Sequence, residues 1–142
     1  MPIVDASVVV DWIAPGAAAD GPARLALDRL AHDGAELVAP RLLLEEVSNA
    51  LLTGVRQRRW SGTAADIAHG LLRELPVRLA DEPRDLARAW DLARRFDDHP
   101  IYDLIYVAMA ERRRTMLVTA DRALRRRLVG LDYVIGPEQL LD

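Results

Sequence analysis

The sequence contains no cysteine, no lysine and no long apolar run. The absence of cysteine excludes disulfides, thiolate zinc sites and cysteine nucleophiles, and it is compatible with a reducing cytoplasm. No segment approaches the roughly 18 consecutive apolar residues that a membrane-spanning helix requires. The N-terminus also lacks the basic segment and apolar core of a secretory signal. We therefore expect a cytoplasmic protein without a membrane-spanning segment.

Because lysine is absent, all 19 basic residues are arginine. They gather in clusters at Arg56, Arg58 and Arg59, at Arg94 and Arg95, at Arg112, Arg113 and Arg114, and at Arg125, Arg126 and Arg127. Guanidinium groups match phosphate oxygens well, but cations also complement the carboxyl ends of helices, and both interpretations stay open. The net charge of −3 argues against a non-specific nucleic-acid binder.

Several familiar active-site motifs are also missing. The chain has no Gly-x-x-x-x-Gly-Lys phosphate loop, no Gly-x-Gly-x-x-Gly fingerprint and no Gly-x-Ser-x-Gly elbow. Its three histidines, His32, His69 and His99, are scattered and lack the spacing of metal ligands. His99 precedes Pro100, so we interpret it as a loop or capping residue.

Short β-rich segments alternate with longer helical ones, a pattern typical of an α/β fold with a mostly parallel sheet of about five strands. We expect a single domain over residues 1–142. The strands are predicted at residues 3–4, 37–39, 77–79, 116–118 and 133–135. The helices are predicted at residues 7–13, 20–32, 40–58, 61–75, 83–96, 101–113 and 121–128, with Ser7 and Ser61 as caps.

Four acidic residues, Asp5, Glu46, Asp103 and Asp121, lie beside or within apolar segments, where an unpaired carboxylate is unfavourable. Asp5 and Asp121 follow predicted strands, and the carboxyl ends of parallel strands share one edge of the sheet. Asp103, in the first turn of its helix, can point back at that edge, whereas Glu46 needs a favourable helix crossing to join. Clustered carboxylates repel one another unless a cation or a basic partner intervenes. The pattern is therefore compatible with a metal site made of oxygen ligands.

Each acid also has a simpler explanation. Asp121 could cap the helix that follows it, and Asp103 could stabilise the dipole of its own helix. Glu46 could face solvent, as we expect of its neighbour Glu45. Asp5 is the hardest to explain structurally, because it directly follows a buried strand.

Carboxylates without histidine or cysteine prefer hard cations such as Mg²⁺ or Mn²⁺. Such an ion suits phosphoryl chemistry, because it can activate a water and stabilise the leaving oxygen. Ser7, Asn49 and Thr119 are polar neighbours that could orient the ligands or a water, although capping and surface hydrogen bonds are alternative roles for them.

Four blocks of the sequence resemble the PIN-domain ribonucleases, specifically the short VapC-type toxins of bacterial toxin–antitoxin pairs. The blocks are Ile3-Val4-Asp5-Ala6-Ser7, the segment 40–51 with Glu46-Val47 and Asn49, the segment 99–110 around Tyr102-Asp103, and Leu117-Val118-Thr119-Ala120-Asp121. The third block followed closely by the fourth is the most specific part of the match.

The resemblance implies a three-layer α/β/α domain and a Mg²⁺- or Mn²⁺-dependent endoribonuclease in which Asp5, Glu46, Asp103 and Asp121 bind the metal. It selects Glu46 over Glu45, because the acid directly precedes the valine. It further implies a homodimer and a VapB-like antitoxin that inserts an arginine into the acidic groove. Some PIN nucleases carry another acid after the fourth, where this chain has Arg122-Ala123, so the resemblance leaves the number of metal ions open.

Two other functions fit the same residues. A metal-dependent DNA nuclease or phosphatase would use the same acids, and a catalytically silent binding module would use them only to dock a basic partner.

Overall fold

Five short parallel strands form the centre of the molecule in a computed structural model that describes residues 1–142. Along the sheet their order is β3 (Val77–Leu79), β2 (Leu37–Ala39), β1 (Ile3–Val4), β4 (Leu117–Val118) and β5 (Val134–Ile135). All four neighbouring pairs are parallel. The predicted α/β class and the number of strands are confirmed, and the sheet proves to be entirely parallel.

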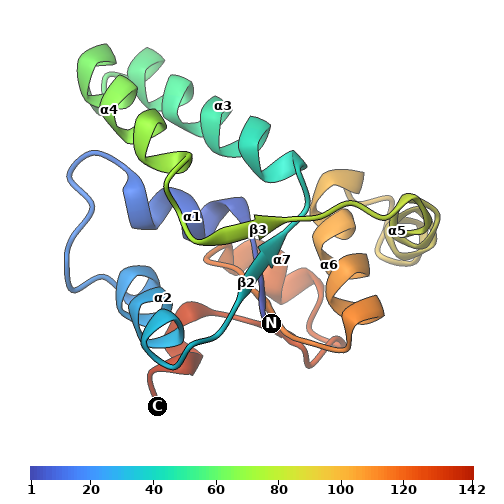
Figure 1. Ribbon diagram of the computed structural model, residues 1–142. Coiled ribbons are helices and arrows are strands. Elements are labelled where there is room, and N and C mark those ends of the chain that lie inside the picture. Colours follow the sequence, from blue (N-terminus) through green and yellow to red (C-terminus); the bar gives the residue numbers. More distant parts are fainter.

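Helices connect the strands and flank the sheet (Figure 1). They are α1 (Ala6–Ile13), α2 (Pro22–His32), α3 (Leu42–Arg56), α4 (Gly62–Leu72), α5 (Pro83–Arg95), α6 (Ile101–Arg113) and α7 (Arg122–Arg127), and a short 3₁₀ helix, η1 (Pro137–Leu140), follows β5. In Figure 1, α3 and α4 run side by side and project beyond the sheet, while α5 and α6 pack against each other on another side.

The first helix begins one residue earlier than predicted, and its cap is Asp5 instead of Ser7. The Asp5 carboxylate accepts a hydrogen bond from the Ala6 backbone N–H at 2.8 Å. The Ser7 hydroxyl is engaged elsewhere, because it donates to Asp5 and accepts from the Ala120 backbone N–H. Ser61 caps α4 as predicted, by accepting from the Ala64 N–H.

Other helix ends differ from the prediction for local reasons. The helix α3 begins at Leu42 rather than at Pro40, after a turn in which the Pro40 carbonyl accepts from the Leu43 N–H. It cannot reach Arg58, whose φ of 59° lies in the left-handed region. The helix α4 ends at Leu72 instead of residue 75, because a residue that precedes a proline is disfavoured in helical geometry.

The core is one continuous hydrophobic cluster that runs through the sheet and the helices packed on it. Both residues of β1 are completely buried, as are Val38 of β2 and Leu117 of β4. The central strand therefore ends deep inside the molecule, and whatever follows it is held in a buried position. None of the helices is long and apolar enough to cross a membrane.

The turn after α3 is fixed by a large side chain that packs on a glycine. The Trp60 indole N–H donates to the Leu51 carbonyl of α3 at 2.9 Å. Its ring lies against Gly54, where any Cβ would collide with the indole. The contact therefore holds residues 59 and 60 against α3.

We predict that Gly54→Ala lowers the free energy of unfolding by about 1–3 kcal/mol, because the added methyl group overpacks the Trp60 ring. The matched control is Gly70→Ala in α4, where a Cβ meets open space. Replacing this glycine inside a helix by alanine should stabilise the protein by up to about 1 kcal/mol. Urea denaturation of both variants checks the two opposite signs, and equal effects would contradict the assigned contact.

Candidate functional site

A cavity of about 480 Å³ lies at the carboxyl ends of β1 and β4, and all four acids singled out in the sequence line it. Asp5 follows β1, Glu46 comes from α3, Asp103 from the first turn of α6, and Asp121 precedes α7. The sheet edge therefore brings together residues that are up to 116 positions apart in the chain. Whether these acids bind a metal stays a prediction.

Asp5 is the most deeply buried acid of this cavity, with 5% of its surface exposed. The carboxylate accepts from the Thr119 hydroxyl at 2.7 Å and from the Ser7 hydroxyl at 2.9 Å, in addition to the Ala6 N–H. Thr119 is fully buried and in turn accepts from the Asp121 backbone N–H. Ser7 and Thr119 thus orient Asp5, which is the kind of role that the sequence suggested for them.

Burial raises the pKa of Asp5 to about 6. The hydrogen bonds from Thr119 and Ser7 lower the pKa, and the negative charge of Asp103 raises it again. Desolvation therefore outweighs the hydrogen bonds, and the carboxylate is left with less compensation than its charge requires. A cation beside Asp5 would stabilise the negative charge that the hydrogen bonds leave only partly compensated.

Glu46 faces the cavity, whereas its neighbour Glu45 is exposed to solvent. The Glu46 Oε1 atom is buried and has no hydrogen-bond partner. Burial raises the pKa of Glu46, and so do the charges of Asp5 and Asp103. The nearby Tyr106 hydroxyl lowers this pKa, although the two groups do not reach hydrogen-bonding geometry, since the hydroxyl is also unpaired. Glu46 thus presents an unsatisfied oxygen next to two other acids.

Asp103 is held by a histidine that the sequence analysis assigned to a loop or cap. The Asp103 Oδ2 atom lies 2.7 Å from His99 Nε2, and His99 Nδ1 lies 2.8 Å from Arg127 Nη1. A guanidinium can only donate, so Nδ1 accepts and the Nε2–H donates to the carboxylate. His99 lies in the loop just before α6, and its spacing of four residues from Asp103 is a usable local signal. Arg127 lies too far along the chain to be paired with them from the sequence.

Asp121 does cap the following helix, by accepting from the Leu124 N–H at 3.0 Å, and it lines the cavity at the same time. The structural and the functional interpretation of this residue are therefore compatible. Asn49 does not join the group. Its side chain is exposed, does not line the cavity and makes no hydrogen bond to any of the four acids.

Two charged residues that the sequence analysis did not place at the site also line the cavity, namely Asp11 of α1 and Arg59 after α3. Arg59 was noted only as part of an arginine cluster. It is the one basic residue that lines this acidic cavity, and it forms no salt bridge.

The acids suit a hard divalent cation by their chemistry, and the unpaired Glu46 oxygen beside Asp5 and Asp103 is where such an ion would relieve repulsion. No three acidic or histidine side chains are arranged to surround one ion directly. This is compatible with Mg²⁺, which usually keeps several waters and binds through only one or two carboxylates. Asp5, Glu46, Asp103 and Asp121 are thus the candidates to hold the ion, directly or through water.

Comparisons with known proteins agree with this geometry. The family model described as the PIN domain matches residues 3–127. The fold is similar to the crystal structure of PAE2754 from Pyrobaculum aerophilum, with a TM-score of 0.71 and 25% sequence identity over 99% of this chain and 91% of that one. No curated protein sequence matches the chain.

Asp5→Asn should reveal the unfavourable charge of Asp5 in metal-free protein. Folding raises the pKa of Asp5 from 3.8 to about 6, so the folded protein binds a proton on the Asp5 carboxylate more tightly than the unfolded chain does. The stability from protonated Asp5 is complete below the unfolded pKa and is lost as the pH rises through about 6. At pH 8 in EDTA we therefore expect Asp5→Asn to be more stable than the natural protein by up to about 3 kcal/mol.

Urea denaturation at pH 4 and pH 8 measures this difference, which should nearly vanish at pH 4. Added Mg²⁺ should stabilise the natural protein and leave Asp5→Asn unchanged. A variant that is less stable than the natural protein at both pH values would contradict the desolvation argument.

We also predict that His99 positions Asp103 for metal binding. His99→Leu removes the Nε2–H donor and should weaken Mn²⁺ affinity by about tenfold, whereas His99→Gln keeps an N–H donor and should restore part of it. Isothermal titration calorimetry measures the affinities, with exposed His32→Leu as the control. Unchanged Mn²⁺ affinity in His99→Leu would exclude this role.

Proposed function

The chain belongs to the PIN-domain family, whose members are generally metal-dependent nucleases, and from this we propose that it is a Mg²⁺- or Mn²⁺-dependent endoribonuclease. The observation that carries the proposal is the single open cavity that collects Asp5, Glu46, Asp103 and Asp121 at the carboxyl edge of the sheet. Uncompensated carboxylates gathered in this way suit a site that stabilises charge on a phosphodiester.

Asp5 and Glu46 have different roles in this proposal. Asp5 is the fixed ligand, because Ser7 in the first turn of α1 and Thr119 after β4 hold its carboxylate. Glu46 supplies the unpaired oxygen. A bound divalent ion lowers the pKa of water and neutralises charge on the leaving oxygen.

Arg59 reaches the same cavity from the turn after α3 and has no carboxylate partner, so it is free to bind a phosphate oxygen. It gives an otherwise acidic groove one contact suited to the RNA backbone. This reconciles a polyanionic substrate with a chain whose net charge is −3.

RNA is the proposed substrate because the blocks around Asp5, Glu46, Asp103 and Asp121 resemble VapC-type toxins. On that basis the protein is a toxin of a toxin–antitoxin pair that acts in the cytoplasm. Its natural inhibitor would be a VapB-like antitoxin that places an arginine in the acidic cavity. A guanidinium satisfies clustered carboxylates much as a cation does.

We also propose a homodimer. Large apolar side chains are exposed on the α3–α4 pair, namely Leu52, Ile67 and Leu71, with 57%, 65% and 43% of their surfaces accessible. A second copy of the chain would remove this apolar surface from water.

The proposal predicts that the protein cleaves single-stranded RNA in Mg²⁺ or Mn²⁺ and that Asp5→Asn and Asp103→Asn each reduce cleavage by at least about a hundredfold, since each removes a carboxylate from the cavity. The control is Asp91→Asn, which changes an exposed acid on α5 and should leave the rate unchanged. Gel electrophoresis of labelled RNA measures the rates.

The same assay distinguishes the alternatives. DNA cleaved as readily as RNA would favour a general nuclease, and equal RNA cleavage by all four proteins would overturn the role of the acids. If the natural protein does not cleave RNA in either metal, the endoribonuclease proposal fails.

A further inference from the structure

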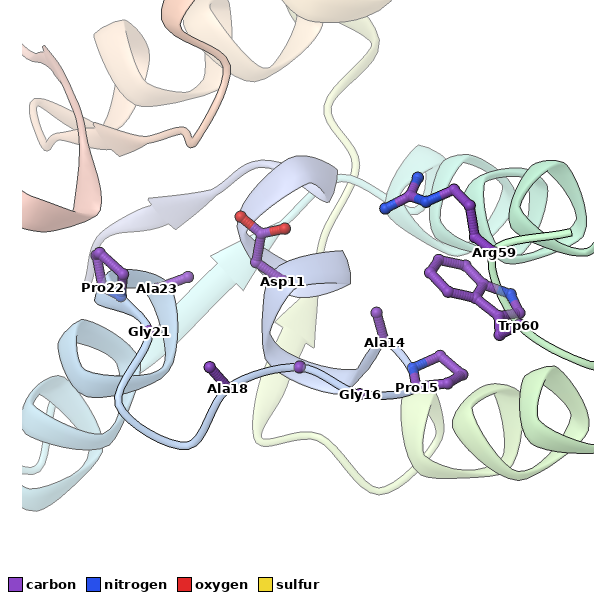
Figure 2. Close-up of a pocket in the computed structure, with 11 residues that line it drawn as sticks. Asp11, Ala14, Pro15, Gly16, Ala18, Gly21, Pro22, Ala23, Arg59 and Trp60 are labelled. Carbon is purple, nitrogen blue, oxygen red and sulfur yellow. The ribbon is translucent and has the colours of Figure 1, made fainter. Parts of the chain in front are cut away.

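A second cavity of about 260 Å³ lies beside the acidic one (Figure 2). In Figure 2 the loop between α1 and α2 borders it from below, the start of α2 closes one side, and Arg59 and Trp60 close the other. Asp11 of α1 lies between these two sides and also lines the cavity. The cavity is therefore built from two segments that are far apart in the chain, residues 11–23 and residues 59–60.

The two cavities share a wall. Asp11 and Arg59 line both, so a chain that lies across the acids can continue directly into the second space. An RNA strand that has one phosphate at the acidic cavity would place its neighbouring nucleotide in the second cavity. This continuity links the second cavity to the proposed reaction.

Arg59 is positioned to hold a phosphate at the junction. Its guanidinium carbon lies 4.8 Å from the centroid of the Trp60 ring, and Trp60 is itself anchored to the Leu51 carbonyl. Cation–π contact fixes the plane of the guanidinium without using its N–H donors. Those donors stay available for phosphate oxygens or for stacking against a base.

Asp11 is suited to read a base. No donor in the structure hydrogen-bonds to its carboxylate, and it forms no salt bridge, although Arg59 is near. Partial burial raises the pKa of Asp11, and the charge of Arg59 lowers it. A carboxylate accepts from the exocyclic amino group of a base, as aspartate does with cytosine N4.

The floor of the cavity is lined by small residues, among them Ala14, Gly16 and Ala18. Gly16 has a φ of 75°, which a side chain would strain, and open space surrounds its Cα. A flat ring can therefore approach the backbone of this loop closely.

We propose that this cavity is a nucleotide subsite: Arg59 binds the phosphate next to the scissile one, and Asp11 selects a base that carries an amino group over uracil. The proposal rests on the proposed ribonuclease function, and it names the part of the molecule that determines the cleavage sequence. Single-stranded RNA is recognised in this way, through a base that is splayed out and read on its edge.

The first test is the cleavage profile of an unstructured RNA pool, read by sequencing the product ends. The natural protein should prefer an amino-bearing base at one position flanking the cut, and Asp11→Asn should reduce that preference by about tenfold. Arg59→Gln should raise KM more than it lowers kcat and weaken the salt dependence of binding. Matched controls are Asp91→Asn and Arg56→Gln, exposed residues that line neither cavity.

The second test does not depend on cleavage. RNA tetranucleotides are titrated into Asp5→Asn protein with Mg²⁺, and amide and indole NMR signals are followed. Cytosine-containing tetranucleotides should shift the signals of Gly16, Gly21 and Trp60, oligouridine should shift them at least about fivefold less, and Asp11→Asn should remove the difference.

The outcomes separate the two proposals. A natural protein that cleaves RNA with a profile identical to that of Asp11→Asn would overturn the subsite alone. If the natural protein cleaves no RNA, but cytosine-containing tetranucleotides still shift these signals in Asp5→Asn protein, the ribonuclease proposal is overturned and the subsite is supported. Signals of Gly16, Gly21 and Trp60 that respond to none of the tetranucleotides would overturn the subsite whatever the cleavage result.

Discussion

The buried carboxylate of Asp5 is the constraint around which the rest of the site is arranged. β1 is the central strand and completely buried, so the residue after it is almost buried and meets solvent only through the acidic cavity. The hydroxyl groups of Ser7, in the first turn of α1, and Thr119, after β4, donate hydrogen bonds to it. These bonds orient the carboxylate but do not offset its desolvation, since its pKa stays raised at about 6. The fold thus tolerates an unfavourable charge in the cavity that four other acids also line.

Glu46 and Asp103 interact electrostatically with the charged carboxylate of Asp5. The charge of Asp103 raises the pKa of Asp5, and the charges of Asp5 and Asp103 raise the pKa of Glu46. Neither Glu46 nor Asp103 forms a salt bridge with an arginine. Asp103 instead receives a neutral donor from His99, which fixes its position without cancelling its charge. A guanidinium in its place would neutralise the carboxylate and compete with any cation for it. The protein keeps its acids oriented and its negative charge intact.

The sequence predicted much of this arrangement because most of the signals are local. Most strands are predicted from a short apolar segment and residues 77–79 from an alternating one, and Asp5 and Asp121 follow two of these strands. The strand order could not be read in this way, since it depends on pairs such as Ile3 with Leu117. The cap of α1 was assigned to Ser7, because nothing local shows that the Ser7 hydroxyl is engaged by Asp5 and Ala120. Asn49 was included by proximity in sequence to Glu46, but the helix turns it away.

Residues whose roles depend on distant segments could not be found from the chain alone. His99 gains its orientation from Arg127, and Arg59 gains its place from the contact of Trp60 with Gly54. The four acids therefore differ from Asp11 and Arg59 in how the fold holds them. Asp5 and Asp121 follow buried strands, and Glu46 and Asp103 lie on helices that pack in the hydrophobic core. Asp11 and Arg59 are exposed at the junction with the loop between α1 and α2, where substitutions leave the core intact. Under the proposed function, substitutions at Asp11 and Arg59 would change the preferred sequence and leave the acids of the metal site unchanged.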